Sequence, residues 1–142
     1  MNQTPTFDLI IIGGGPAGVT AALRGRELGA TVALIERGAM GGTCTNDGCV
    51  PTRVLARAAR LMSNAGQYAG YGMTVPRPEL DFRQLLARTQ AIVYEIHEKK
   101  QLSAHLEAAG AQVYADVGEA RFVDPHTVAL PDGRQMRPRR PC

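Results

Sequence analysis

A run of six residues, Gly13-Gly14-Gly15-Pro16-Ala17-Gly18, constrains the fold of this chain more than any other feature. It follows the apolar segment 7–12, whose isoleucine-rich composition is typical of a buried parallel strand. It leads into residues 17–28, where apolar side chains recur at helical spacing and Pro16 suits the first turn. A second apolar strand is predicted over residues 31–35. This succession of strand, glycine turn, helix and strand is the opening of a doubly wound α/β sheet.

The glycine run has the G-x-G-x-x-G spacing of a dinucleotide-binding turn. Gly13 allows a tight turn, Gly15 leaves room for a pyrophosphate beside the backbone, and Gly18 allows close packing of helix on strand. The helix start directs free N–H groups and a positive dipole end at the phosphates. Glu36 follows the second strand, where a carboxylate accepts hydrogen bonds from ribose hydroxyls and favours FAD or NAD over NADP. The alternatives are a glycine-rich turn in another α/β domain and an ordinary carboxylate at the end of a strand.

Two of the three cysteines, Cys44 and Cys49, lie close together in the sequence. In a regular helix five residues rise about 7.5 Å, which exceeds the Cα separation of a disulfide, about 4.4–6.8 Å. Gly48 supplies backbone freedom and Pro51 is expected to interrupt the hydrogen-bond ladder, so we expect an irregular first turn that holds both sulfurs together. Near a helix start we also expect lowered thiol pKa values. Two unpaired buried thiols are the alternative.

No metal site is expected. A closed zinc site needs four ligands, and no pair among the three histidines, His97, His105 and His126, has the spacing of metal ligands. His97 and His105 stand among charged residues of a helical stretch, so we expect them to be solvated helix residues without a functional role.

Periodicity predicts the remaining elements: an interrupted helix over 43–65, a loop over 67–78, a long helix over 80–109 broken near Gln101, a strand over 112–114, and an antiparallel ribbon over 119–123 and 127–130. Asp132-Gly133 is a turn signal for a third strand of the ribbon. The run 136–142 holds basic residues and prolines, so it is not expected to form a central strand. We therefore expect one domain over residues 1–135 and an unfolded basic tail over residues 136–142.

Composition excludes several classes of function. Apolar residues make up 44% of the chain, which is enough for a packed core. Aromatic residues make up only 5%, and the net charge of +3 has no clustered basic surface in the folded part, so no nucleic-acid partner is expected. The apolar run 9–12 is too short for a signal segment or a membrane span. We expect a cytoplasmic protein with no membrane partner.

The segment 41–53, with the sequence GGTCTNDGCVPTR, closely resembles the active-site segment of the pyridine nucleotide-disulfide oxidoreductases, a family that includes dihydrolipoamide dehydrogenase, glutathione reductase and mercuric reductase. The glycine run and Glu36 stand at the family's spacing, and residues 117–122 resemble the strand after its long helix. The resemblance extends to about Leu130. It implies a Rossmann-like FAD/NAD(P)-binding domain with a central parallel sheet and an antiparallel β ribbon, incomplete at its C-terminus.

The resemblance also implies a function and the residues that perform it. The implied activity is that of an FAD-dependent dithiol/disulfide oxidoreductase, with Cys44 as the interchange thiol and Cys49 as the thiol facing the flavin. The implied cofactor-binding residues are Gly13, Gly15, Pro16, Ala17, Gly18, Glu36, Arg37, Gly42, Thr43, Arg53, Gly118 and Ala120. At Arg53 the family commonly has a lysine beside the flavin, and arginine is not its equivalent; a solvated helix residue is the alternative there.

Members of this family are much longer, form homodimers, and add a nicotinamide domain and an interface domain. We therefore expect a truncated form, with NAD(P)H used only by a full-length protein and little turnover by this chain. The substrate, a small molecule or a dithiol, stays open between a dihydrolipoyl group, a small disulfide and mercuric ion. The alternatives are a non-catalytic dinucleotide-binding or redox-sensing module and a plain NAD-binding dehydrogenase, although the latter leaves the cysteine segment without a purpose.

Overall fold

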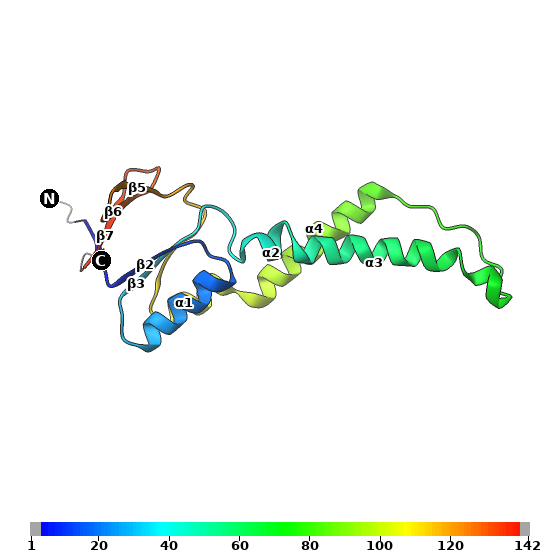
Figure 1. Ribbon diagram of the computed structural model, residues 1–142, viewed down its shortest axis with the longest axis horizontal. Helices are drawn as coiled ribbons and strands as arrows, with labels where there is room; N and C mark the ends of the chain where they lie inside the picture. The colour runs from blue at the N-terminus through cyan, green and yellow to red at the C-terminus, as the bar shows by residue number, and fades with distance from the viewer. Residues whose placement is uncertain (1–3, 140–142) are drawn as a thin grey trace. The chain divides into compact units, whose positions relative to one another are not determined.

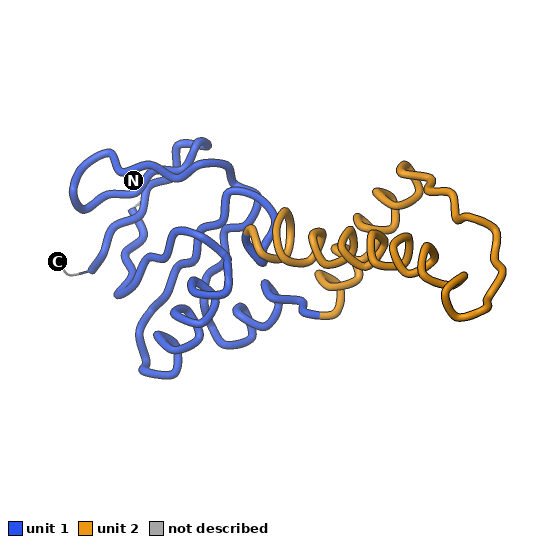
Figure 2. The backbone as a smooth tube through the Cα atoms, turned by 45° about the vertical axis from the view of Figure 1, so that its right-hand side comes forward, with its two compact units in different colours: residues 1–42, 100–142 blue, residues 43–99 orange. Residues whose placement is uncertain are grey.

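The computed structural model describes residues 4–139 of the chain. Contacts divide the protein into two compact units, one made of Met1–Gly42 with Lys100–Cys142 and the other of Thr43–Lys99. Figure 2 shows the first unit in blue and the second in orange. We call them the sheet unit and the helical unit. The helical unit is inserted in the sequence between the two segments of the sheet unit.

The sheet unit contains a parallel sheet with the strand order β2-β3-β4, formed by Leu9–Ile12, Val32–Ile35 and Gln112–Tyr114. Helix α1 (Pro16–Glu27) connects β2 to β3 (Figure 1), and α5 (Leu102–Ala108) precedes β4. These elements confirm the predicted strand, glycine turn, helix and strand, and with them the Rossmann-like parallel sheet.

Strand β3 is the centre of this sheet, and all four of its residues are buried. Successive side chains of a strand point to opposite faces, so β3 contributes to two separate cores. The core on the helix side comprises Ala22, Val32, Leu34, Met40, Leu106 and Ala111. The core on the other face comprises Phe7, Ala33, Ile35, Val128, Leu130 and Met136. Burial on both faces explains why the sequence of β3 is continuously apolar.

A second sheet has the order β1-β7-β6-β5, formed by Thr6–Phe7, Gln135–Pro138, Thr127–Ala129 and Arg121–Asp124. Strands β5, β6 and β7 run antiparallel, and β7 pairs with β1 in parallel. The predicted ribbon and the turn at Asp132-Gly133 are therefore confirmed, and the turn is closed by a hydrogen bond from the Leu130 N–H to the Arg134 carbonyl at 2.8 Å.

The prediction that the run after residue 135 cannot be a central strand is wrong. Strand β7 lies between β1 and β6, and Met136 is 1% exposed in the core shared with Phe7. A ribbon strand needs only one buried face, so the alternation of exposed Gln135, buried Met136 and exposed Arg137 is sufficient. The expected basic tail is thus a strand as far as Pro138, and residues 140–142, including Cys142, lie outside the described part.

Pro138 is tolerated in β7 because its missing N–H removes no bond to β1. The residues on either side of it donate on that edge: the Arg137 N–H to the Pro5 carbonyl at 3.1 Å and the Arg139 N–H to the Phe7 carbonyl at 2.7 Å. On the opposite edge, the pairing of β7 with β6 extends only to Met136. The proline therefore occupies a position where the ladder needs no donor.

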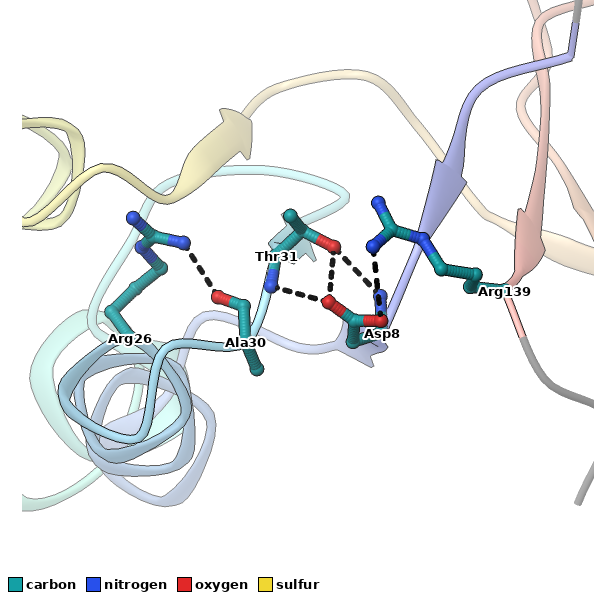
Figure 3. A network of polar contacts seen from close by, with 5 residues as sticks. All are labelled: Asp8, Arg26, Ala30, Thr31 and Arg139. Atoms are coloured by element: carbon teal, nitrogen blue, oxygen red, sulfur yellow. Dashed lines mark hydrogen bonds and ion pairs between the residues drawn. The ribbon is translucent and has the colours of Figure 1, made fainter.

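Polar contacts fix the start of β2 against β3 and the end of β7 (Figure 3). The Asp8 carboxylate accepts hydrogen bonds from the Thr31 N–H at 2.8 Å and from the Thr31 hydroxyl at 2.7 Å. Arg139 reaches the same carboxylate at 3.6 Å. Exposed ion pairs contribute little stability, so hydrogen bonds hold the strand starts together: the two to the Asp8 carboxylate, and those from the Asp8 N–H to the Thr31 hydroxyl and from the Asp8 and Leu9 N–H groups to the Thr31 carbonyl.

The helical unit begins with an irregular helical segment. Helix α2 (Gly42–Asn46) starts at the last residue of the sheet unit, and α3 (Cys49–Ala65) follows after a break at Asp47-Gly48. The break confirms the predicted interruption near Gly48. The expected interruption at Pro51 is wrong, because Pro51 lies in the first turn of α3, where its missing N–H has no intrahelical partner to lose.

Two further elements complete the helical unit. The predicted loop after α3 contains a short 3-10 helix, η1 (Tyr68–Tyr71). Helix α4 (Phe82–Lys100) then follows, and its buried residues are Thr89 and Val93. Gln101 separates α4 from α5 in the left-handed conformation, with φ 42°, which confirms the predicted break at this residue.

Candidate functional site

In the sheet unit, the glycine run turns the chain from β2 into α1. The Gly13 N–H donates to the Ile35 carbonyl at 2.7 Å, and Gly13 adopts φ 109°, a conformation that favours glycine. Gly15 precedes the first helical residue, Pro16, and the first turn of α1 contains no acidic side chain. The free N–H groups and the positive end of the helix dipole are therefore not neutralised by the helix itself, which suits an anion.

The glycines at this turn differ in whether the protein itself leaves room for a side chain. A Cβ atom on Gly18 would lie 1.9 Å from the Gly13 carbonyl oxygen, and one on Gly42 would lie 2.8 Å from the Gly15 Cα. A Cβ atom on Gly15 would meet only the Gly42 Cα, at an ordinary 3.7 Å. Gly18 and Gly42 are thus required by the packing of the protein, whereas Gly15 leaves open space that a ligand would use.

Glu36 is held by the backbone of this turn. Its carboxylate oxygens accept hydrogen bonds from the Gly14 N–H at 2.7 Å and from the Gly38 N–H at 3.0 Å. The side chain is half-buried at the end of β3, so both bonds fix its direction. A carboxylate oxygen accepts more than one hydrogen bond, and this anchored group retains acceptor capacity for hydroxyl donors.

The segment after β4 completes a cavity beside Glu36. The N–H groups of Val117 and Gly118 donate to the carbonyls of Glu36 and Arg37 at 3.4 and 3.1 Å. The cavity has a volume of about 270 Å³ and is lined by Ile12, Gly13, Ile35, Glu36, Arg37, Gly118, Glu119 and Ala120. The structure therefore brings Gly118 and Ala120 together with the glycine turn and Glu36, as a nucleotide site would require.

In the helical unit, Cys44 lies in α2 and Cys49 is the first residue of α3. Gly48 allows the chain to return toward Cys44, because a Cβ on Gly48 would lie 2.9 Å from the Thr43 carbonyl oxygen and 3.6 Å from the Cys44 Cα. Both cysteines are exposed and free, and their thiols share a hydrogen bond. The distorted turn thus holds the two sulfurs together, so they are not the two buried thiols of the alternative interpretation.

The thiol pKa of Cys44 corrects one expectation. The hydrogen bond to Cys49 raises the pKa of Cys44 above its ordinary value, and desolvation and the nearby charge of Cys49 act in the same direction. The Cys49 backbone and the positive charge of Arg53 lower the pKa but do not compensate. The lowered pKa predicted from the helix start is therefore wrong for Cys44, because the partner sulfur stabilises its protonated form.

Replacing Cys49 with alanine is expected to lower the pKa of Cys44, because the partner that stabilises the protonated thiol is lost. At a pH below the Cys44 pKa of the unaltered chain, a larger fraction of Cys44 is then thiolate in the variant, and alkylation of Cys44 is faster. The measurement is the rate of iodoacetamide labelling against pH, read on the tryptic peptide that contains Cys44, which is 38–53 in the unaltered chain and in Cys49→Ala and 38–57 in Arg53→Gln. Arg53→Gln serves as the opposite control, and its midpoint is expected to rise. If the pH midpoint of Cys44 labelling in Cys49→Ala is unchanged or higher, Cys49 is not the group that raises the pKa of Cys44.

One pair of residues near the cysteines was not identified from the sequence. His97 of α4 forms a hydrogen bond with Asn46, which lies between the two cysteines in the sequence. His97 is half-buried and is therefore not the solvated residue that we expected, whereas His105 is exposed. The signal that was missed is spacing: His97 stands four and eight residues after the buried Val93 and Thr89 on the same helix.

Within residues 4–139, no group of three or more His, Cys, Asp and Glu side chains is arranged to hold a metal ion. The same residues include no helix that is both long and apolar enough to span a membrane.

Comparison with known proteins identifies the family. A model of the pyridine nucleotide-disulphide oxidoreductase family matches residues 7–137. A dihydrolipoyl dehydrogenase of Thermus scotoductus is 41% identical over 127 residues, which cover 88% of this chain and 26% of that protein. A mercuric reductase of Staphylococcus aureus is 35% identical over 129 residues, which cover 91% of this chain and 23% of that protein. The chain thus spans about a quarter of the length of these relatives, and it belongs to the pyridine nucleotide-disulphide oxidoreductase family.

Proposed function

We propose that this chain is the FAD-binding and redox-active part of a flavin-dependent dithiol/disulfide oxidoreductase. The observation that carries the proposal is the contact between the Cys44 and Cys49 thiols in a distorted turn. The chain also contains a glycine turn with an anchored Glu36 and an adjacent cavity. A plain dehydrogenase would use the nucleotide site but would have no use for the paired thiols.

The sheet unit supplies the nucleotide-binding part of the proposal. The N–H groups at the start of α1 bind phosphate oxygens, and Glu36 accepts hydrogen bonds from ribose hydroxyls. Gly15 leaves room for the pyrophosphate, and the cavity bordered by Gly118 and Ala120 receives the adenine end. Pro16, Ala17, Arg37 and Thr43 complete this set of cofactor-binding residues, and Gly18 and Gly42 support it by allowing the close backbone packing of the turn.

The helical unit supplies the thiols of the proposal. FAD, when bound, carries two electrons between a nicotinamide and the cysteine pair. Cys44 is the thiol that exchanges with the substrate, and Cys49 is the thiol that faces the flavin. Cys44 reacts as the thiolate, so the Arg53 charge, which lowers its pKa, favours the reactive form. Use of NAD(P)H, a homodimer and a disulfide or metal-ion substrate belong to a longer polypeptide of the family.

The absorbance spectrum of the full chain tests this function. With FAD added and a dithiol as reductant, flavin bands with a new long-wavelength shoulder are expected. Cys49→Ser is expected to abolish the shoulder, because no thiolate then faces the flavin, while Cys44→Ser retains it. NAD(P)H-linked turnover by the 142-residue chain is expected to be negligible. Flavin uptake without any shoulder would instead favour a non-catalytic dinucleotide-binding module, and a chain that takes up no FAD would contradict the proposal.

A further inference from the structure

We propose that His97 is a positioning residue for the cysteine pair: through Asn46 it holds the turn between Cys44 and Cys49 in the geometry from which their disulfide closes. The inference deepens the proposed function and rests on it, because it assigns His97 to the redox step of the same two thiols. His97 itself contacts neither sulfur in this assignment, and it acts through the amide of Asn46.

The contact is direct and short. The His97 Nε2 lies 2.7 Å from the Asn46 Oδ1, although 51 positions separate the two residues in the sequence. An amide oxygen only accepts hydrogen bonds, so Nε2 is the donor. Both the neutral tautomer protonated at Nε2 and the imidazolium provide that donor, and the contact therefore does not depend on the charge of the ring.

Packing fixes both partners of this hydrogen bond. On α4, Thr89 and Val93 are 4% and 9% exposed, and His97 continues their row at a spacing of four residues. The Thr89 hydroxyl donates a hydrogen bond to the Leu85 carbonyl of the same helix at 2.8 Å, so the burial of Thr89 leaves its hydroxyl with a partner. On α2, Thr45, the neighbour of Asn46, is 4% exposed. The donor, His97, therefore lies on a packed helix, and its acceptor, Asn46, is the neighbour of the buried Thr45.

The short helix α2 needs such a tertiary contact. It has five residues, and an isolated helix of that length is not stable in water. Asn46 is its last residue, and the helical turn ends with the hydrogen bond from the Asp47 N–H to the Thr43 carbonyl at 2.9 Å. The close approach of Gly48 to the Cys44 backbone follows at once. Fixing Asn46 therefore fixes the turn that returns Cys49 to Cys44.

Thiol–disulfide exchange with glutathione measures this positioning without any flavin. One of the two cysteine thiolates attacks oxidised glutathione, forming a mixed disulfide and releasing one reduced glutathione. The other attacks the protein sulfur of that disulfide, closes the Cys44–Cys49 bond and releases the second reduced glutathione. Two electrons pass from the protein thiols to oxidised glutathione, and two protons balance the products. The equilibrium constant reports how well the two sulfurs are held together.

The experiment equilibrates the full chain with glutathione buffers, quenches with acid and labels free thiols with N-ethylmaleimide. Trypsin then releases peptide 38–53, which contains both cysteines and excludes Cys142. His97→Leu is expected to lower the equilibrium constant roughly three- to tenfold, the worth of one hydrogen bond. His97→Gln, whose amide nitrogen replaces Nε2 as the donor, is expected to restore most of it. His105→Leu, which changes an exposed histidine, serves as the matched control and is expected to have no effect.

A double-mutant cycle with Asn46→Ala separates positioning from a general loss of stability. If His97 acts through Asn46, His97→Leu has no further effect on the equilibrium constant in the Asn46→Ala background, and thermal unfolding shows that each variant is folded. An equilibrium constant in His97→Leu equal to that of the unaltered chain overturns the positioning role and leaves the proposed function intact. Fully additive effects of His97→Leu and Asn46→Ala on the equilibrium constant likewise overturn the positioning role and leave the proposed function intact. If the unaltered chain forms no Cys44–Cys49 disulfide at any glutathione ratio, the proposed function fails, and the positioning role fails with it.

Discussion

Replacing Gly18 with alanine is expected to destabilise the sheet unit by about 3 kcal/mol or more, because the new methyl carbon would lie 1.9 Å from the Gly13 carbonyl oxygen. That contact joins the first helix to the end of β2, and neither backbone can move without disturbing the parallel sheet. Urea unfolding followed by far-ultraviolet circular dichroism measures the loss. Binding of FAD is expected to fall with the folded fraction.

Gly15→Ala is the matched variant at the same turn. Its methyl carbon would meet only the Gly42 Cα at 3.7 Å, and Gly15 has φ −75°, which any residue adopts. Stability is therefore expected to change by less than about 1 kcal/mol, while FAD affinity is expected to fall at least about tenfold because the methyl group occupies the space of the pyrophosphate. If both variants lost the same free energy of unfolding, or if Gly15→Ala kept full FAD affinity, the conclusion that Gly18 serves packing and Gly15 serves the ligand would be contradicted.

Met136→Ala is expected to cost about 2–5 kcal/mol of stability, as is usual when a buried methionine is truncated to alanine. Met136 is 1% exposed and packs in the core formed with Phe7, Ile35 and Val128. The large effect is expected because the side chain joins β7 to both the second sheet and the underside of β3. Urea unfolding of the full chain provides the measurement.

Gln135→Ala, at the neighbouring exposed position of β7, is the control. It is expected to change stability by no more than about 0.5 kcal/mol. If Met136→Ala and Gln135→Ala behaved alike, the C-terminal segment would not be part of the core, and the original expectation of an unfolded tail would be restored.

The elements that the sequence predicted well are those whose signal is local. The glycine run, the apolar strands on either side of α1 and the break at Gln101 each depend on a few adjacent residues, and all three were found. Strand β7 is not predicted by the composition of its segment, because arginines and a proline disfavour a central strand. The alternation around Met136, which is what a half-buried strand requires, is equally visible in the sequence.

The site was predicted less completely than the fold, for a different physical reason. The proximity of Cys44 and Cys49 follows from Gly48 and a short spacing, so it was foreseen. The raised pKa of Cys44 depends on which neighbour its thiol meets, and no spacing rule contains that information. The contact of His97 with Asn46 joins distant parts of the chain, so it becomes visible only when α4 has been placed beside α2.

The pairing of β1 with β7 imposes an order on folding during synthesis. The Pro5 and Phe7 carbonyls accept their hydrogen bonds from Arg137 and Arg139, so β1 has no partner until the far end of the described chain has been made. At about 5–20 residues per second a ribosome needs on the order of ten seconds to produce the chain between them. The helical unit comprises residues 43–99, which lie between the two segments of the sheet unit. All residues of the cysteine turn are therefore synthesised before the sheet unit can close around β1.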